Sequence, residues 1–482
     1  MSLKLKTEPM AHQQKVYDAY KGVPYFALFW DQGTGKTKGL IDHVAYAYHQ
    51  KVVNCLVVIA PNGVHANWVN EELPKHMSVP YEAFTYYNSM GKKWENDLVD
   101  FIDSDNHKDV LKVVCFPMEG FSHAPKQRKT FEYVLDNHTC YGVVDESDDI
   151  GNYKANRTKY LLGLAHKFRV RRIATGTPVD AKPLAAWTQL QFLSPKIFNQ
   201  DYFSFRARYS IMRDKVIKIG STERIQKFPV AHRNLDKLHD IIASVSDRVL
   251  KEECMDLPEK VYQTIPLQMS KEQQRYYNDM MDRAFYLIEE SDDLVYAKNA
   301  LDMMGKLSRI TGGFVEKGVP CKTNPKMKWL VSNIEKYTVS ADVIIWCGFR
   351  DEIAETVKQL GSDQCVSIHG DIVGKEREEA VDSFKNDADK KILVTNKCMS
   401  RGFTLINART NIFYSNRYSL RDRRQMEDRT HRRGQEGSCL NIDLVCENSI
   451  DEYVLDALKK KKDVAELVMG DETRDWIKTT RG

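Results

Sequence analysis

The sequence predicts an α/β protein with two doubly wound parallel-sheet lobes, a helical insertion and a helical C-terminal tail. Three observations lead to this prediction. Short, almost continuously apolar runs alternate with segments long enough for helices, this alternation occurs twice, and a helix-rich stretch separates the two occurrences. Near-continuous apolarity indicates strands that are buried on both faces, which is typical of parallel sheets covered by helices.

The first lobe is predicted from five apolar runs that are rich in β-branched and aromatic residues. They occupy residues 25–30, 56–60, 113–116, 141–145 and 172–175. Segments such as 36–50 lie between them and are long enough for crossover helices.

The pattern changes in the middle of the chain and then returns. Residues 190–233 are aromatic and basic, and residues 270–309 have a strongly helical composition. Five further strands are predicted at 342–347, 365–369, 391–395, 411–415 and 440–445, before a charged helical tail that starts at Ser449. We therefore expect an N-terminal lobe at 1–235, a linking helical insertion at 236–320, and a C-terminal lobe with its tail at 321–482.

The composition is that of an ordinary globular protein and excludes a chain that is disordered throughout. Hydrophobic residues make up 42% and charged residues 29%, and the net charge of +4 is too small to indicate a polyanionic partner by itself. No apolar run approaches the roughly 18 residues of a membrane span. Ten scattered cysteines without a CxxC pair predict buried reduced thiols and no zinc site. We expect a soluble intracellular protein without a membrane partner, in the cytoplasm or the nucleoid or nucleus, or in the host cytoplasm if it is viral.

A glycine-rich turn follows the first predicted strand and opens the next helix. Such a turn lets backbone N–H groups converge on a phosphate, and the helix N-terminus adds partial positive charge. Lys36 would reach the β- and γ-phosphates of a nucleotide, and the Thr37 hydroxyl would ligate Mg²⁺. Trp30 stands where the general pattern has its first glycine, so a chance glycine-rich turn is the alternative. The predicted nucleotide-binding residues here are Gly33, Thr34, Gly35, Lys36, Thr37 and Lys38.

Two adjacent acids end the predicted strand at 141–145. Asp145 would bind Mg²⁺, and Glu146 would orient and deprotonate the attacking water. A solvated strand exit is the alternative interpretation, and the phosphate loop upstream makes the catalytic one stronger.

The ordered motifs of the chain resemble those of superfamily-two helicases and translocases, and among these the Swi/Snf-type DNA translocases. The resemblance implies two RecA-like lobes and an adenine-reading role for Gln13, and it adds Gly402 and Gln425 to the nucleotide site. One departure is Asp148, where many relatives have a histidine that links the ATP site to the DNA side. The matching segments are His12-Gln13, 33–37, Ala60-Pro61, Asn67-Trp68, Glu71-Glu72, 145–148, 175–178, 248–251, 257–260, Ser270, 273–276, His369-Gly370, Arg377, 400–405 and 425–435.

Two arginines near the C-terminus complete the predicted ATPase site. Arg429 and Arg432 are three residues apart, so on a helix they would share one face. An arginine beside the γ-phosphoryl oxygens stabilises the charge of the transition state. If both come from the second lobe, ATP would lie between the lobes and its binding would close them. Some of the nearby arginines 417, 421, 423 and 424 are interpreted as a solvated basic face.

Contacts of such a motor with nucleic acid should be made mainly to phosphates, which carry no sequence information. The candidates are residues in loops after strands, and each has a purely structural role as its alternative. They are Asn62, Gly370, Arg377, Thr395 and Lys397. The lysine run at 459–462 is better interpreted as a solvated helix face.

The predicted function is that of an ATP-dependent DNA helicase or translocase, a DNA-dependent ATPase that uses ATP and Mg²⁺. It would act as a monomer on duplex or branched DNA without sequence preference. One alternative is an RNA helicase, against which the 248–276 segment and His431 argue. Another is a nucleotide-dependent DNA-binding scaffold with little turnover, against which the intact Lys36, Asp145 and Glu146 argue.

Overall fold

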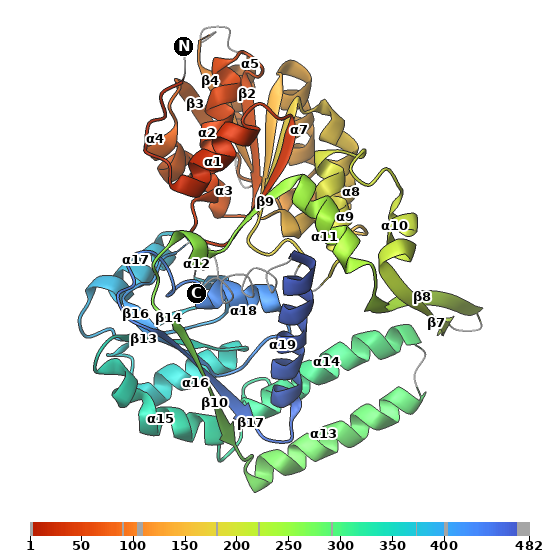
Figure 1. Cartoon of the computed structure of the whole chain (residues 1–482). Helices are drawn as coiled ribbons and strands as arrows, with labels where there is room; N and C mark the ends of the chain where they lie inside the picture. The colour runs from red at the N-terminus through yellow and green to blue at the C-terminus, as the bar shows by residue number, and fades with distance from the viewer. Residues whose placement is uncertain are drawn as a thin grey trace, which may run out of the picture. The chain divides into compact units, whose positions relative to one another are not determined.

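The computed structural model describes residues 3–88, 91–103, 109–179, 182–219, 222–290, 293–372, 374–399 and 403–469. The chain forms two compact units. The first contains Met1–Ile211 and Ala231–Asp256, and the second contains Met212–Val230 and Leu257–Lys462. Each unit is built around its own sheet (Figure 1), which confirms the predicted fold class of two parallel-sheet α/β lobes.

The first unit contains a seven-stranded sheet in the order β3-β4-β2-β5-β6-β1-β9, with every pair parallel. The five predicted strands are confirmed to within two residues at each end. The edge strands β3 and β9 were not predicted, because they are short and only partly buried. The strands are β1 Tyr25–Trp30, β2 Cys55–Ala60, β3 Tyr81–Thr85, β4 Leu111–Pro117, β5 Cys140–Asp145, β6 Val170–Ala174 and β9 Ser246–Val249.

Helices cover both faces of this sheet. On one face Leu40 and Val44 of α2 pack against Leu28 and Val58 of the strands, and all four are fully buried. Burial of each such side chain contributes about 1.5–3 kcal/mol. The helices are α1 Ala11–Tyr20, α2 Lys36–His49, α3 Val64–Asn67, α4 Leu73–His76, α5 Lys92–Asp103, α6 Gly120–His123, α7 Pro125–Asn137, α8 Asn156–Leu164, α9 Ala185–Leu193, α10 Tyr202–Tyr209, α11 Leu235–Ser244 and α12 Lys251–Cys254.

The second unit contains a six-stranded parallel sheet in the order β10-β17-β16-β13-β15-β14. All five predicted strands of this lobe are present, and only β16 is displaced, by up to three residues. β10 was not predicted, because it is a largely exposed edge strand without an apolar run. The strands are β10 Lys260–Leu267, β13 Asp342–Trp346, β14 Cys365–Ile368, β15 Ile392–Thr395, β16 Ala408–Phe413 and β17 Cys439–Cys446.

The helices of the second unit form two layers. Residues of α15 and α16 pack on one face of β13 with Val343 and Ile345, and residues of α17 and α18 pack on the other face with Ile344 and Trp346. The predicted helical segment 270–309 is confirmed as two neighbouring helices, α13 and α14 (Figure 1). The helices are α13 Lys271–Glu290, α14 Asp293–Thr311, α15 Pro325–Thr338, α16 Arg350–Leu360, α17 Gly374–Asn386, α18 Leu420–Glu427 and α19 Ile450–Met469.

Two small sheets complete the fold. The aromatic and basic stretch ends in a two-stranded ribbon of β7 Ser210–Ile219 and β8 Thr222–His232, and β11 Phe314–Glu316 pairs with β12 Val319–Pro320. All ten cysteines are free and eight are buried, as the sequence predicted. Within the described ranges, no helix combines the length and the apolarity that crossing a membrane requires.

Candidate nucleotide site

The glycine-rich loop between β1 and α2 has a backbone that few other residues could adopt. Gly33 and Gly35 have φ angles of 84° and 83°, in the left-handed region that glycine enters without steric cost. A Cβ atom on Gly35 would lie 2.2 Å from the Gln13 amide nitrogen. The close approach of Gln13 therefore requires a glycine at position 35, and a glycine-rich turn that opens a helix fits the binding of a phosphate group.

Helix α1 supports this cradle from its outer side. His12 Nε2 lies 2.9 Å from the carbonyl oxygen of Thr34, and the amide of Gln13 donates to the carbonyl oxygen of Gly35 at 3.0 Å. The Gln13 side chain also accepts a bond from the Met10 backbone N–H at 2.8 Å. Gln13, which the resemblance assigns to adenine recognition, thus lies directly against the loop.

Lys36 opens α2 and is buried. Its ammonium group donates to the carbonyl oxygens of Trp30 at 3.0 Å and Asp31 at 3.1 Å. Lys38 forms a buried ion pair with Asp42 one turn later, whereas Thr37 is only half-buried. Lys36 and Thr37 therefore lie at the start of the helix that follows the glycine-rich loop, and Lys38 has a structural partner.

Asp145 is held at the end of β5 by two donors. Trp68 Nε1 donates to one carboxylate oxygen and the Glu146 backbone N–H to the other, each at 3.0 Å. Burial raises the pKa of Asp145 to about 6 and the charge of Glu146 adds to this, while the Trp68 bond and the Lys36 charge lower it. A bound cation beside Asp145 would favour the ionised form of its carboxylate. Mg²⁺ prefers oxygen ligands, so this fixed carboxylate is suited to bind it.

The acids after β5 are connected to the end of β6. The Thr175 hydroxyl donates to Asp148 at 2.9 Å and lies 3.4 Å from a Glu146 carboxylate oxygen. The Thr177 hydroxyl lies 3.4 Å from the second oxygen of Asp148. Asp148 thus provides an acceptor that joins these two segments, at the position where a histidine was expected.

Glu146 itself has a left-handed backbone, with φ 53° and ψ 54°. A non-glycine residue in this region costs about 1–3 kcal/mol and persists only where its surroundings impose it. Such strain is most common at functional sites, which agrees with the predicted role of Glu146 as the base.

Two supporting contacts were not predicted from the sequence. Trp68 lies 77 residues from Asp145 in the chain, and Arg248 of β9 donates to the Phe29 carbonyl oxygen at 2.8 Å while it pairs with Asp31 at 2.9 Å. Both residues lie in segments that resemble family motifs. The motif resemblance was the signal that could have singled out Trp68 and Arg248. It did not indicate that they would bind Asp145, Phe29 and Asp31.

The arginines of the second unit differ from their predicted arrangement. Helix α18 ends at Glu427, so Arg429 and Arg432 lie in the turns after it and not on one helix face. Arg429 Nε donates to the Gln425 carbonyl oxygen at 3.1 Å, and the Arg429 backbone N–H donates to the Met426 carbonyl oxygen at 3.1 Å. Arg429 also donates to Phe403 O at 2.8 Å, and Arg432 donates to the Thr404 hydroxyl at 3.0 Å.

The interpretation of some neighbouring arginines as a solvated face does not apply to Arg423. This side chain is buried and forms ion pairs with Asp443 and Glu427, which compensate the cost of its burial. Gln425 is also buried, in the same helix. Gly402 lies outside the described residues.

The residues predicted to contact nucleic acid differ in their exposure to solvent. Asn62, Gly370 and Lys397 are exposed in loops after strands, as a phosphate contact requires. Arg377 lies on α17 and donates to the Ile372 carbonyl oxygen at 2.9 Å. Thr395 is fully buried and its hydroxyl donates to the Ile368 carbonyl oxygen at 2.7 Å, so a phosphate contact there needs this bond to open.

With this geometry in place, the comparison with known families is decisive. Residues 23–311, more than half of the chain, match the SNF2-related domain, and residues 325–434 match the helicase conserved C-terminal domain. The chain belongs to the SNF2-related family. This membership confirms the resemblance to the Swi/Snf-type proteins of superfamily two.

Several curated proteins align with most of this SNF2-related chain. It is 25% identical over 441 residues to the DNA annealing helicase and endonuclease ZRANB3 of Mus musculus. It is 23% identical over 478 residues to the ISWI chromatin-remodeling complex ATPase ISW1 of Saccharomyces cerevisiae. The alignments cover 90% and 91% of this chain but only 38% of each relative, so the chain spans less than half the length of these proteins.

A solved structure also aligns with the SNF2-related chain. The SWI2/SNF2 ATPase core of Sulfolobus solfataricus in complex with dsDNA is 20% identical, with a TM-score of 0.42. The alignment covers 98% of this chain and 96% of the other.

Proposed function

We propose that the chain is a DNA-dependent ATP hydrolase that couples hydrolysis to movement along duplex or branched DNA, or to its remodelling. The observation that carries this proposal is the arrangement in the first unit of Lys36, at the opening of α2, and the buried carboxylate of Asp145. The Lys36 charge is close enough to lower the pKa of Asp145. A cation for phosphates and an acid for a metal are thus combined in a member of the SNF2-related family.

We assign the nucleotide contacts to the loop between β1 and α2. Its backbone N–H groups would bind phosphate oxygens, and Lys36 would exchange the carbonyl oxygens of Trp30 and Asp31 for the β- and γ-phosphates. Thr37 and Asp145 would hold Mg²⁺. The metal, when bound, neutralises charge on the phosphates. Glu146 would take the proton of the attacking water, with the Thr175 hydroxyl beside its carboxylate.

We propose that Arg429 and Arg432 supply the positive charge that the transition state needs. Both lie in the unit that does not hold the glycine-rich loop. On this proposal the two units come together when ATP is bound and separate after hydrolysis, which converts one chemical step into a mechanical cycle. The motor would work as a monomer.

DNA is the proposed polymer. The printed names of ZRANB3 and ISW1 refer to DNA annealing and to chromatin remodelling, and the exposed Asn62, Gly370 and Lys397 are suited to phosphate contacts that do not select sequence. An RNA helicase and a DNA-binding scaffold with little turnover are the competing functions. We place the protein inside the cell, where DNA and ATP are available.

The decisive experiment measures ATP hydrolysis with single-stranded, duplex, forked and four-way DNA, and with RNA of equal length. We expect duplex or branched DNA to stimulate most, without dependence on base sequence. Binding should weaken with salt at a slope near −0.9 per neutralised phosphate on duplex DNA. Equal hydrolysis without nucleic acid, or stimulation by RNA alone, contradicts the proposal.

A further inference from the structure

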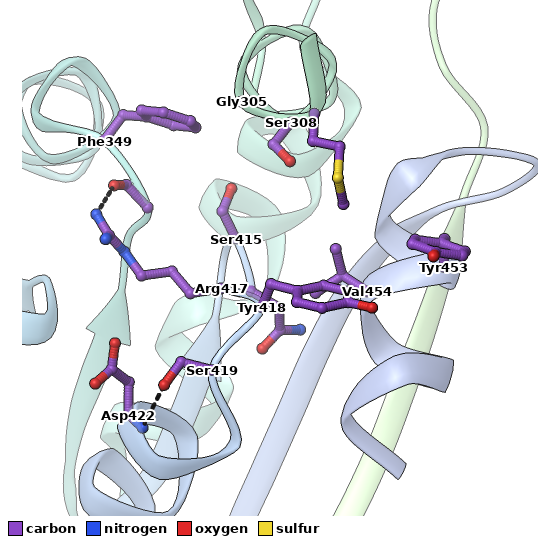
Figure 2. Close-up of a pocket in the computed structure, with 13 residues that line it drawn as sticks. Gly305, Ser308, Phe349, Ser415, Arg417, Tyr418, Ser419, Asp422, Tyr453 and Val454 are labelled. Carbon is purple, nitrogen blue, oxygen red and sulfur yellow. Dashed lines mark hydrogen bonds between the residues drawn. The ribbon is translucent and has the colours of Figure 1, made fainter. Parts of the chain in front are cut away.

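The second unit contains a cavity of about 500 Å³ that no step of the proposed ATPase uses. The lining comes from α14, α19 and the loops that follow β13 and β16 (Figure 2). Phe349, Tyr418 and Tyr453 provide aromatic surfaces, and Arg417 and Asp422 provide opposite charges. The volume is within the range of small-molecule sites.

The cavity lies at a place in the sheet where α/β proteins bind ligands. β13 and β16 are neighbours, but the chain continues from β13 towards the β14 edge and from β16 towards the β17 side. The loops after such strands separate and leave a crevice at their carboxyl ends. Gly348 and Phe349 follow β13, and residues 415–419 follow β16, so this crevice is the cavity.

The aromatic residues offer flat faces to a ligand. The rings of Tyr418 and Tyr453 lie 6.1 Å apart at 18° from parallel, and both side chains are exposed. One face of Phe349 is covered by the Arg309 guanidinium, 4.4 Å from the ring centre, and Arg309 is held by Asp351. Phe349 is thereby fixed in position at the opposite side of the cavity from Tyr453 (Figure 2). Such faces are suited to a planar aromatic group.

The cavity contains a polar donor, Arg417, and a polar acceptor, Asp422, and each can make further hydrogen bonds. Arg417 donates to the Gly348 carbonyl oxygen at 2.8 Å, but its buried Nε has no hydrogen-bond partner among the described residues. Asp422 uses its backbone N–H to bind the Ser419 hydroxyl, and in the described part of the chain its carboxylate has no hydrogen bond or ion pair. A ligand that offers both an acceptor and an N–H donor in one plane would satisfy both groups.

We propose that this cavity binds a nucleobase presented by a nucleic acid strand. A nucleobase is planar, stacks on aromatic rings and carries ring acceptors beside N–H donors, so it fits the aromatic faces, Arg417 and Asp422 together. A phosphate fits less well, because the Asp422 carboxylate would repel it.

The position of the cavity favours a strand as the source of the base. All strands of this sheet are parallel, so the loops after β13, β14, β15 and β16 lie at one edge. The exposed Gly370 and Lys397, which we propose as phosphate contacts, follow β14 and β15 at this edge. The inference that the base comes from a nucleic acid strand therefore rests on the proposed function. The inference that the cavity binds a nucleobase rests on the residues that line it.

The test uses 2-aminopurine, a fluorescent base that is quenched when it stacks. One arm contains it in single-stranded DNA and as an unpaired base in a duplex, and the other arm uses the free riboside. We expect quenching by the wild-type chain, about tenfold weaker binding of the base by Tyr453→Ala, and nearly unchanged binding by Tyr453→Phe, because only the ring is needed. Asp422→Asn should alter which base is preferred, because it replaces an acceptor with a donor.

The outcomes separate this proposal from the proposed function. Quenching with DNA that is lost in Tyr453→Ala and retained in Tyr453→Phe supports the site. Quenching with the riboside alone supports a nucleobase site but overturns the strand as its source. No quenching in either arm, or equal quenching in Tyr453→Ala, overturns the proposal even if DNA stimulates ATP hydrolysis. Absence of that stimulation contradicts the motor, while the riboside arm still decides the cavity.

Discussion

The loop after β1 in the first unit and the loop after β13 in the second both connect a buried parallel strand to a helix. In the first, Gly33 and Gly35 have positive φ angles, and Lys36 adds a positive charge at the N-terminus of α2. In the second, a carboxyl group from the same helix caps the N-terminus of α16. The carboxylate of Glu352 accepts bonds from the backbone N–H groups of Gly348 at 2.7 Å and Phe349 at 3.2 Å.

Glu352 satisfies hydrogen-bond donors of the second loop without a ligand. Its other oxygen accepts the Ser415 hydroxyl at 2.8 Å, and the side chain is fully buried. Burial raises the pKa of Glu352 to about 7, although the bond from Ser415 and the charge of Lys326 lower it. The second connection thus supplies its helix N-terminus with an internal carboxyl group, whereas we propose an external phosphate for the first.

The largest effect is expected from Lys36→Ala in the first loop. This change removes the charge proposed to contact the β- and γ-phosphates, so it should abolish ATP hydrolysis and weaken ATP binding. Steady-state hydrolysis and titration with a fluorescent ATP analogue measure the two effects.

Glu146→Gln is the matched control for Lys36→Ala, because it removes only the base. It should block hydrolysis while ATP remains bound. Normal hydrolysis by Glu146→Gln means that the base has been assigned to the wrong residue.

Arg429→Ala or Arg432→Ala should lower kcat by about 10³-fold, with a smaller change in ATP affinity, because their charge is proposed to act in the transition state. Single-turnover hydrolysis and nucleotide binding measure these effects. A scattering measurement with a non-hydrolysable analogue distinguishes lost charge from failed closure of the units. Wild-type turnover in both variants removes the second unit from the catalytic mechanism.

The raised pKa of Asp145 predicts a pH dependence of metal binding by the first unit. Below about pH 6 the carboxylate takes up a proton that Mg²⁺ must displace, so Mg²⁺ affinity should fall by about tenfold for each pH unit below that value. Titration with Mn²⁺ followed by electron paramagnetic resonance measures this in the absence of turnover. Asp145→Asn should bind weakly at every pH, and a wild-type affinity that is constant from pH 5 to 8 contradicts the assignment.

Glu352→Gln tests the second loop and should change stability only moderately. The pKa of Glu352 is raised from 4.5 to about 7, so the folded wild-type chain binds the extra proton between these values. Its stability should therefore fall as pH rises through this window, by about 1.4 kcal/mol per pH unit. The variant lacks this slope, and urea unfolding at pH 5, 6 and 8 measures the difference. Parallel pH profiles for both chains contradict the raised pKa of Glu352.

The parts of the molecule that the sequence predicted well are those where one segment carries its own signal. The central strands are continuous apolar runs, and the loop at 33–37 and the acids at 145–146 directly follow such strands. The edge strands β9 and β10 have no such run. They pair with β1 and β17, and this pairing is not visible in their own residues. The turns that carry Arg429 and Arg432 also escaped prediction, because the spacing of the two arginines does not indicate that the helix ends at Glu427.

Contacts between distant segments were the other part that could not be predicted. Trp68 and Asp145, or Glu352 and Ser415, meet only after the sheets have formed. A motif predicts that a residue lies near the end of a strand. Its hydrogen-bond partner on another segment depends on how the segments pack in the folded chain. Domain limits at 1–235, 236–320 and 321–482 remain predictions.

The distribution of the thiols gives the chain a natural pair of labelling positions. Eight of the ten cysteines are buried, and the two half-buried ones are Cys254 in the first unit and Cys398 in the second. Burial raises the pKa of both thiols, so maleimide dyes should attach slowly and best at mildly alkaline pH. Energy transfer between a donor and an acceptor dye on these two positions could follow the separation of the units through an ATP cycle, without engineered cysteines.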